Sequence, residues 1–252
     1  MRAIRLFPVV LLAALLPLGA QAAELQVYCP ALVNEAMTDL AADFTRETGT
    51  KVTVTTKPMG KMVESIQAAA PVADVVILPP DLMDQLDRQG GVEAGSRANL
   101  ARVEIGLAVA EGAPKPDLSS VESFRAALLA AKTVTYTKPG PPRFSLEAQI
   151  IDAMLKRPEF AGVHGMPAPS GSGVGFLAAG NADMAMQVIP EIIATKDIVL
   201  VGPLPPALGT HIDVSASVFA HSSAAAEAHR FIAYITGPKA AAVWKAQGIA
   251  RN

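Results

Sequence analysis

The chain has 252 residues, of which 51% are hydrophobic, so it is long enough for one large domain or two lobes with a buried core. Its 21 basic and 23 acidic residues give a formal net charge of −2, which argues against a nucleic-acid-binding protein because such proteins carry an excess of basic residues. The single cysteine excludes an internal disulfide.

The amino terminus has the pattern of a secretory signal peptide over residues 1–22. Arg2 and Arg5 precede an apolar stretch, and Ala20-Gln21-Ala22 provides an A-x-A cleavage site. The apolar stretch is too short for a membrane-spanning helix. Cleavage would leave 19 basic residues against the 23 acidic ones, a net charge of about −4. We therefore expect a soluble mature protein in the periplasm.

The first part of the mature chain alternates between strand and helix patterns. Apolar and β-branched runs predict strands over 25–28, 52–55 and 75–78, and helical spacing of apolar residues predicts helices over 31–48, 62–70 and 81–89. This order implies a mainly parallel sheet with right-handed crossovers.

The rest of the chain continues the alternation. Strands are predicted over 103–109, 134–136, 184–189, 198–201 and 212–218, and helices over 119–131, 144–155, 190–195, 224–235 and 238–247. The long strands at 103–109 and 212–218 bracket a block that has its own βαβ units. We therefore expect lobe 1 to comprise 23–105 plus 211–252 and lobe 2 to comprise the inserted residues 106–210, with the two crossing strands as a hinge.

Two segments of the chain share one pattern, Ala73–Asp81 and Ala182–Glu191. Each starts with Ala-Asp, continues as an apolar run and ends in proline followed by an acid. Such a run is typical of a strand buried on both faces, and the proline and acid suit the first turn of the next helix. Since ligands of open α/β sheets bind beyond the carboxyl ends of such strands, the two copies indicate one wall of a cleft from each lobe.

Six segments resemble the type II periplasmic solute-binding proteins, and most closely the molybdate-binding component of ABC importers. The segments are Leu25–Pro30, Lys51–Thr55, Ala73–Ile77, Asn99–Arg102, Gly180–Asp183 and Tyr234–Ala240. The resemblance implies a two-lobed α/β fold, each lobe a mainly parallel sheet flanked by helices, with a cleft between the lobes. It also implies a monomer that binds a small anion and delivers it to a membrane ABC permease.

In that family a tetrahedral oxyanion is held by hydroxyls and backbone N–H groups at helix starts. Here Cys29-Pro30-Ala31 and Met59-Gly60-Lys61 stand where the family offers serines, and Pro79 and Pro80 remove two backbone donors. These departures leave two ligand classes open, a molybdate-like oxyanion and an organic carboxylate.

Several polar residues fall in the predicted cleft loops. Lys61, Lys138 and Arg143 either bind a polyanionic acid or are solvated loop charges, and Ser145 either caps a helix or meets the ligand. Gln187 is the one polar side chain of its run and needs a partner if it is buried. The predicted ligand-binding residues are Cys29, Pro30, Ala31, Met59, Gly60, Lys61, Pro79, Pro80, Lys138, Arg143, Ser145, Gln187 and Ile189.

No motif assembles a nucleophile, a base and an orienting group. The four histidines lack metal-ligand spacing, and the glycine-rich loop at 171–175 lacks the lysine of a phosphate loop. We therefore expect neither an enzyme nor a bound metal or cofactor. Two alternatives stay open: an exported enzyme that uses Cys29, and a sensory or scavenging protein that delivers its ligand to a receptor.

Overall fold

The computed structural model describes residues 24–68, 73–140 and 145–250. The predicted signal peptide and Arg143 lie outside these ranges. Within them, no helix is both long enough and apolar enough to cross a membrane.

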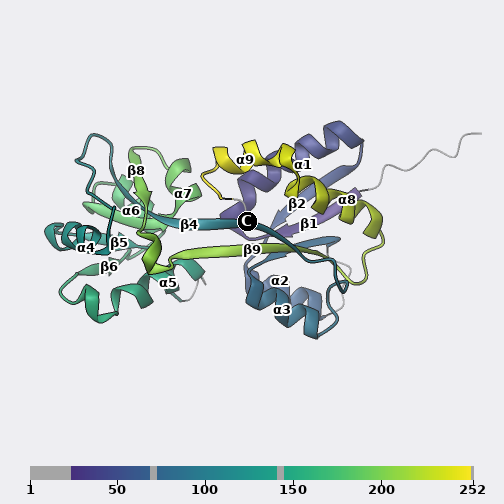
Figure 1. The fold of residues 1–252 in the computed structure, drawn as a ribbon, viewed down its shortest axis with the longest axis horizontal. Coiled ribbons are helices and arrows are strands. Elements are labelled where there is room, and N and C mark those ends of the chain that lie inside the picture. Colours follow the sequence, from purple (N-terminus) through teal and green to yellow (C-terminus); the bar gives the residue numbers. More distant parts are fainter. Residues whose placement is uncertain (1–23, 69–72, 141–144, 251–252) are drawn as a thin grey trace, which may run out of the picture.

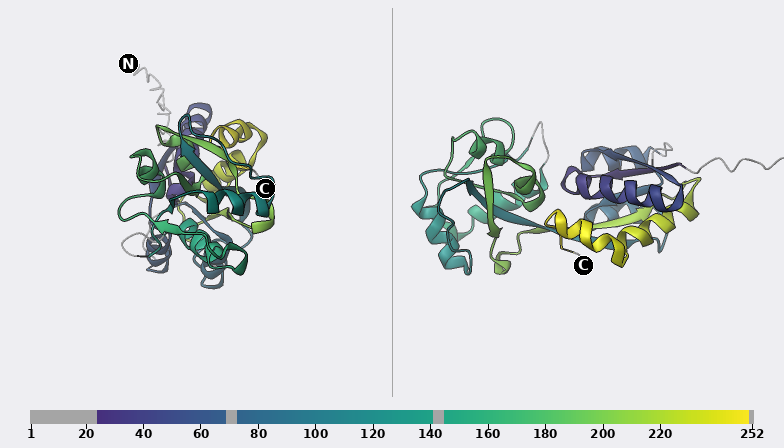
Figure 2. Two further views of the ribbon diagram at one scale, coloured as in Figure 1. Left: turned by 90° about the vertical axis from the view of Figure 1, so that its left-hand side faces the viewer. Right: turned by 90° about the horizontal axis from the view of Figure 1, so that it is seen from above.

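The molecule is elongated, with two α/β lobes joined by two long strands (Figure 1). These strands are β4 (Ala98–Ala110) and β9 (His211–Val218). They pair with each other in antiparallel fashion, from Ala98 opposite Ala216 to Glu104 opposite His211. The view from above shows the two lobes lying end to end (Figure 2).

The first lobe is built on three parallel strands that continue into β9. The strands are β1 (Glu24–Cys29), β2 (Lys51–Thr56) and β3 (Val75–Leu78), in the order β2-β1-β3-β9. The 3-10 turn η1 (Ala31–Val33) leads into α1 (Asn34–Thr48), which lies on one face with α8 (Ala225–Thr236), η4 (Pro238–Ala240) and α9 (Ala241–Ala246). The opposite face carries α2 (Met59–Gln67) and α3 (Pro80–Arg88) (Figure 1).

The second lobe continues the same sheet in the order β4-β7-β5-β6, with β8 paired to the other side of β4. Its strands are β5 (Val134–Tyr136), β6 (Gly165–Pro167), β7 (Met184–Val188) and β8 (Ile198–Pro203). Its helices are α4 (Val121–Ala130), α5 (Leu146–Leu155), η2 (Pro158–Phe160), α6 (Gly173–Ala178), α7 (Ile189–Ala194) and η3 (Pro206–Leu208).

The two repeated segments form equivalent buried strands, as predicted. Strands β3 and β7 are almost entirely excluded from solvent. The aspartate before each strand anchors a neighbouring chain segment. The carboxylate of Asp74 accepts the backbone N–H of Gln26 at 2.9 Å, and that of Asp183 accepts those of Lys132 and Thr133 at 2.8 and 2.9 Å. The Ala-Asp start therefore ties β3 to β1 and β7 to the segment that enters β5.

Aromatic contacts hold the helices on the sheet. Phe44 of α1 meets Phe231 and Tyr234 of α8 edge to face, with ring centroids 5.2 and 5.4 Å apart. In the second lobe, Phe124 of α4 meets Phe160 in the same way at 5.9 Å. Such pairs add to the stabilisation that burial of the rings already provides.

The alternation of strands and helices agrees with the sequence-based prediction, but the sheet is mixed and not mainly parallel, because β9 pairs antiparallel with β3 and β4, and β4 pairs antiparallel with β7 and β8. The bounds of several elements also differ. Strand β4 begins at 98 instead of 103, because its early residues pair with β9. The predicted helix over 62–70 begins at Met59, directly after Pro58. Strand β6 was missed, because three residues that include glycine and proline carry no strand pattern.

A buried hydroxyl in β5 offers a test of the core. Thr135 Oγ1 is fully buried and has no hydrogen-bond partner among the described residues. We expect Thr135→Val to raise the free energy of unfolding by about 1 kcal/mol, because it removes an unsatisfied polar group. Urea denaturation followed by circular dichroism measures this. The matched control is Thr45→Val, which should lower stability because the Thr45 hydroxyl donates to the Ala41 carbonyl at 2.7 Å.

Candidate functional site

The carboxyl ends of the first lobe's parallel strands bring together three of the predicted segments. Strands β1, β2 and β3 run parallel, so the residues that follow them share one edge of the sheet. These residues are Cys29–Ala31, Met59–Lys61 and Pro79–Pro80. The first segment adjoins the chain two residues before the second, since the Lys57 N–H donates to the Cys29 carbonyl at 3.1 Å.

The second lobe has a corresponding edge. Strands β5 and β7 are parallel neighbours, with Tyr136 opposite Met186. Lys138 and Gln187 therefore lie near each other at the carboxyl ends of these strands. Helix α6 begins at the same edge, where Gly173 packs so closely on β5 that a Cβ would lie 2.6 Å from Tyr136 Cα.

The two lobes meet where η1 packs against α7. A small hollow of about 60 Å³ lies there, and its lining comes from the start of α1, from α7 and from the carboxyl-terminal segment. Ala31 is the one predicted ligand-binding residue among those that line it. Glu35 and Glu191 also line it, so two acidic side chains reach this side of the contact between the lobes.

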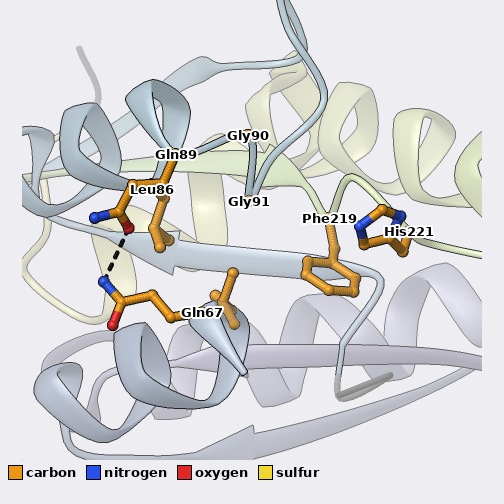
Figure 3. A pocket seen from close by; sticks show the side chains of 8 residues that line it. Gln67, Leu86, Gln89, Gly90, Gly91, Phe219 and His221 are labelled. Carbon is orange, nitrogen blue, oxygen red and sulfur yellow. Dashed lines mark hydrogen bonds between the residues drawn. The ribbon is translucent and has the colours of Figure 1, made fainter. Parts of the chain in front are cut away.

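A larger hollow, of about 380 Å³, lies away from the predicted residues (Figure 3). It is lined by the carboxyl-terminal ends of α2 and α3 and by Phe219 and His221, and the side chains of Gln67 and Gln89 are joined across it at 2.8 Å. The predicted segments Met59–Lys61 and Pro79–Pro80 lie at the opposite ends of the same two helices. This hollow is therefore separate from the candidate site.

The charged and hydroxyl-bearing candidate residues are exposed or make local contacts within their own helices. Lys61 is 69% exposed and pairs with Glu64 on the same helix at 2.7 Å, and Lys138 is exposed. The Ser145 hydroxyl accepts the N–H of Ala148 at 3.1 Å and so caps α5. The capping interpretation of Ser145 is confirmed, and contact of any of these residues with a ligand stays a prediction.

Cys29 is a buried free cysteine. Its side chain is 0% exposed, and its sulfur lies 4.0 Å from Asn34 Oδ1. Burial raises the pKa of the thiol to about 11, although a hydrogen bond with Thr56 acts in the opposite direction. Since the thiolate is the nucleophile, an exported enzyme based on Cys29 is disfavoured.

Gln187 has the partners that its burial requires. Its side chain is 1% exposed, and Nε2 donates to Thr137 Oγ1 at 3.0 Å and to Glu191 Oε2 at 2.8 Å. Its Oε1 accepts the N–H of Val188 at 3.0 Å. Thr137, which the sequence analysis missed, is thus at the centre of the second lobe's polar edge. The signal that could have found it is a threonine placed directly after a predicted strand.

Lys57 was also missed. Its Nζ donates to the Tyr28 hydroxyl at 2.9 Å and lies 4.0 Å from the centroid of the Tyr28 ring. It is a half-buried cation at the edge where β1 and β2 end. Its position two residues beyond the strand predicted over 52–55 was the available signal.

The remaining candidates are apolar and partly buried. Pro30, Pro79 and Ile189 are buried, whereas Met59 and Pro80 are half-buried. Pro30 and Pro79 occupy the positions before η1 and α3. These residues shape the two edges, and a contact with ligand stays a prediction for each of them.

Comparison with known proteins gives consistent matches. The family model described as bacterial extracellular solute-binding protein matches residues 25–250. The chain is 29% identical over 241 residues to the molybdate-binding protein ModA of Azotobacter vinelandii, a match that covers 94% of this chain and 93% of that protein. A substrate-binding domain assigned to a molybdenum ABC transporter of Clostridium difficile has the same fold, with a TM-score of 0.76 at 17% identity over 91% of this chain and 99% of that one.

Another relative has a different name. The chain is 30% identical over 172 residues to an aconitate isomerase of a Pseudomonas species, which covers 66% of this chain. The match spans 64% of that isomerase, which is less than two thirds of its length.

The buried thiol yields a direct test of the enzyme alternative. We expect Cys29 in the folded protein to resist iodoacetamide at pH 8, because with a pKa of about 11 almost none of it is thiolate. Labelling should become complete in urea, where the thiol is exposed. Intact-mass spectrometry measures both states. Rapid labelling of the native protein would contradict the burial described here.

Proposed function

Because the chain belongs to the bacterial extracellular solute-binding proteins, we propose that it binds a small anion between its lobes and presents it to an ABC permease in the membrane. The lobes proposed are residues 23–105 with 211–252 and the inserted residues 106–210. The protein acts as a monomer in the periplasm. Binding energy in such a protein shifts the balance between open and closed arrangements of the lobes.

The two crossing strands, β4 and β9, support the proposal that the lobes can close over a ligand. Strand β4 pairs with β9 up to Glu104 and with β7 and β8 from Ile105 onward, so the backbone changes partners at one point along the strand. The side chains of Arg102 and Asp213 join β4 to β9 at 2.8 and 3.1 Å. A bend near this change of partners would move one lobe against the other without breaking either sheet.

The main support for an anionic ligand is that two helices of the first lobe begin without a side-chain cap. No side chain caps η1 after Pro30 or α2 after Pro58. The first N–H groups of a helix have no intrahelical acceptor, and together with the helix dipole they favour negative charge. In contrast, Ser145 and Ser172 cap α5 and α6 of the second lobe. The uncapped starts at Ala31 and Met59–Lys61 therefore offer donors to an anion.

Two anion classes fit these donors, a molybdate-like oxyanion and an organic carboxylate. Relatives of the chain are named for molybdate and for aconitate, a tricarboxylate. The proposal is binding without turnover, since burial raises the pKa of the Cys29 thiol and the sequence has no motif that assembles a nucleophile, a base and an orienting group. Delivery to a receptor instead of a permease would use the same site.

The ligand class is testable with a thermal-shift screen. We expect one class among molybdate, tungstate, sulfate, phosphate and mono- to tricarboxylates to raise the Tm by about 5–10 °C at a concentration of about 100 times Kd. Delivery to a permease is not tested by this screen; it is tested by asking whether a permease is encoded beside the gene and whether that permease co-purifies with the protein. Failure of every anion to shift the Tm would contradict anion binding.

Turnover is tested on the same protein. Incubated with cis-aconitate, the protein should leave the isomer unchanged by proton NMR. Conversion to the trans isomer that survives Cys29→Ala would show an enzyme with a different reactive group.

The lysine at the start of α2 gives a second test. We expect Lys61→Ala, and likewise Arg143→Ala, to weaken binding of the anion found in the screen about tenfold, because each removes a charge-assisted contact. The matched control is Lys51→Ala, since Lys51 is also exposed and ion-paired, with Glu24 at 2.9 Å, but at the opposite end of β2. Calorimetric titration at low and high salt measures affinity. Equal affinities in all variants would contradict the role of these cations.

A further inference from the structure

In the hydrogen-bond network at the end of β5, the surrounding groups fix which atoms donate and which accept. Gln187 Nε2 lies 2.8 Å from the carboxylate of Glu191, which can only accept when ionised, and Gln187 Oε1 lies 3.0 Å from the N–H of Val188, which can only donate. The opposite orientation of the amide would place acceptor against acceptor and donor against donor. The hydrogen-bond partners therefore fix which amide atom is nitrogen.

This orientation determines the role of the Thr137 oxygen. Gln187 Nε2 carries two hydrogens. It donates one to the Glu191 carboxylate and the other to Thr137 Oγ1, which lies 3.0 Å away. The backbone N–H of Gly173 donates to the same oxygen at 3.2 Å. Two donors occupy both lone pairs of the hydroxyl. The O–H of Thr137 must therefore donate.

That O–H has no acceptor within the described residues. Thr137 is only 5% exposed, so water can reach it poorly in place of a protein acceptor. A buried donor left without an acceptor costs free energy, and a ligand oxygen at this edge of the sheet would supply the missing acceptor. The side chain stands one residue beyond β5, at the edge of the second lobe that the proposed function assigns to the ligand.

The backbone around Thr137 is held firmly. Gly173 packs against Tyr136 with no room for a Cβ, and the Tyr136 hydroxyl donates to Asp152 of α5 at 3.0 Å. The start of α6 and the body of α5 thus fix the end of β5. The position of the backbone at Thr137 is therefore fixed by packing before any ligand arrives.

We infer that Thr137 is a ligand-contacting, specificity-determining residue whose hydroxyl donates to an acceptor oxygen of the bound anion, and that Gln187 is the positioning residue that keeps it a donor. This inference rests on the proposed function and assigns Gln187 an indirect role. A ligand oxygen that carries no proton satisfies the site, as in molybdate or an ionised carboxylate. A ligand that presents an O–H there would set donor against donor.

The test compares side chains of equal shape. Molybdate and trans-aconitate are the probes, and their Kd values are measured by calorimetric titration at pH 7. We expect Thr137→Val to weaken the binding probe about ten- to a hundredfold, because a hydrogen bond to a charged group is lost. Thr137→Ser keeps the hydroxyl and should stay within about threefold of wild type. The control is Thr135→Val, two residues earlier and within β5, which should bind the probe as the wild-type protein does.

The positioning role of Gln187 must be tested by a measurement that a purely structural role would leave unchanged. We expect Gln187→Met to weaken binding in the wild-type background but to have no further effect on affinity in Thr137→Val, since Gln187 acts through Thr137. Such non-additivity is the signature of coupled residues. Equal losses in both backgrounds would overturn the positioning role.

The outcomes separate this inference from the proposed function. Wild-type affinity in Thr137→Val, with a probe that does bind the wild-type protein, overturns the inference and leaves anion binding intact. Binding of neither probe nor any other anion of the screen overturns the proposed function and this inference with it. Should Thr137→Val prove unfolded by circular dichroism, Thr137→Ala replaces it, because the smaller side chain leaves room to hydrate the Gly173 and Gln187 donors.

Discussion

Strand β4 pairs with β9 along its first half and with β7 and β8 along its second half, and the rest of the molecule depends on this sharing. Backbone hydrogen bonds of a sheet cannot be left unpaired without cost, so each half of β4 commits the chain to one lobe. The path of the sheet from β2 to β6 therefore passes through a single strand. Two lobes result, and one continuous cluster of buried apolar residues runs through both of them.

The polar groups of the two lobes are arranged in complementary ways. The first lobe presents uncapped helix starts and the half-buried cation Lys57, so its edge is rich in donors and positive charge. The second lobe caps α4, α5 and α6 with serines but leaves α7 without a side-chain cap, and its buried polar groups include the pair Thr137 and Gln187. An anion between the lobes would meet general electrostatic attraction on one side and a directed hydroxyl on the other. The family assignment confirms the resemblance seen in the sequence, and the ligand follows from these local details.

Local patterns predicted the fold well because the central strands β3, β5 and β7 are buried on both faces. The runs that became β3 and β7 could hardly lie anywhere but in the interior, and the aspartate before each serves the same purpose in both lobes. Short elements escaped prediction where residue type carries little preference, as in Gly165–Pro167. Site prediction was less complete, since Arg143 lies outside the described residues and Lys61 is engaged with Glu64.

The sequence by itself determined the α/β alternation, the family and the edges of the sheet where a ligand would bind, because these depend on periodicity and on residues close together in the chain. Only the tertiary structure decided what each polar group at those edges does. Thr137, Gly173 and Gln187 come from three separate segments, and the direction of a hydroxyl depends on which donors the fold places around it. Likewise, burial raises the pKa of the Cys29 thiol, and no local pattern encodes that burial.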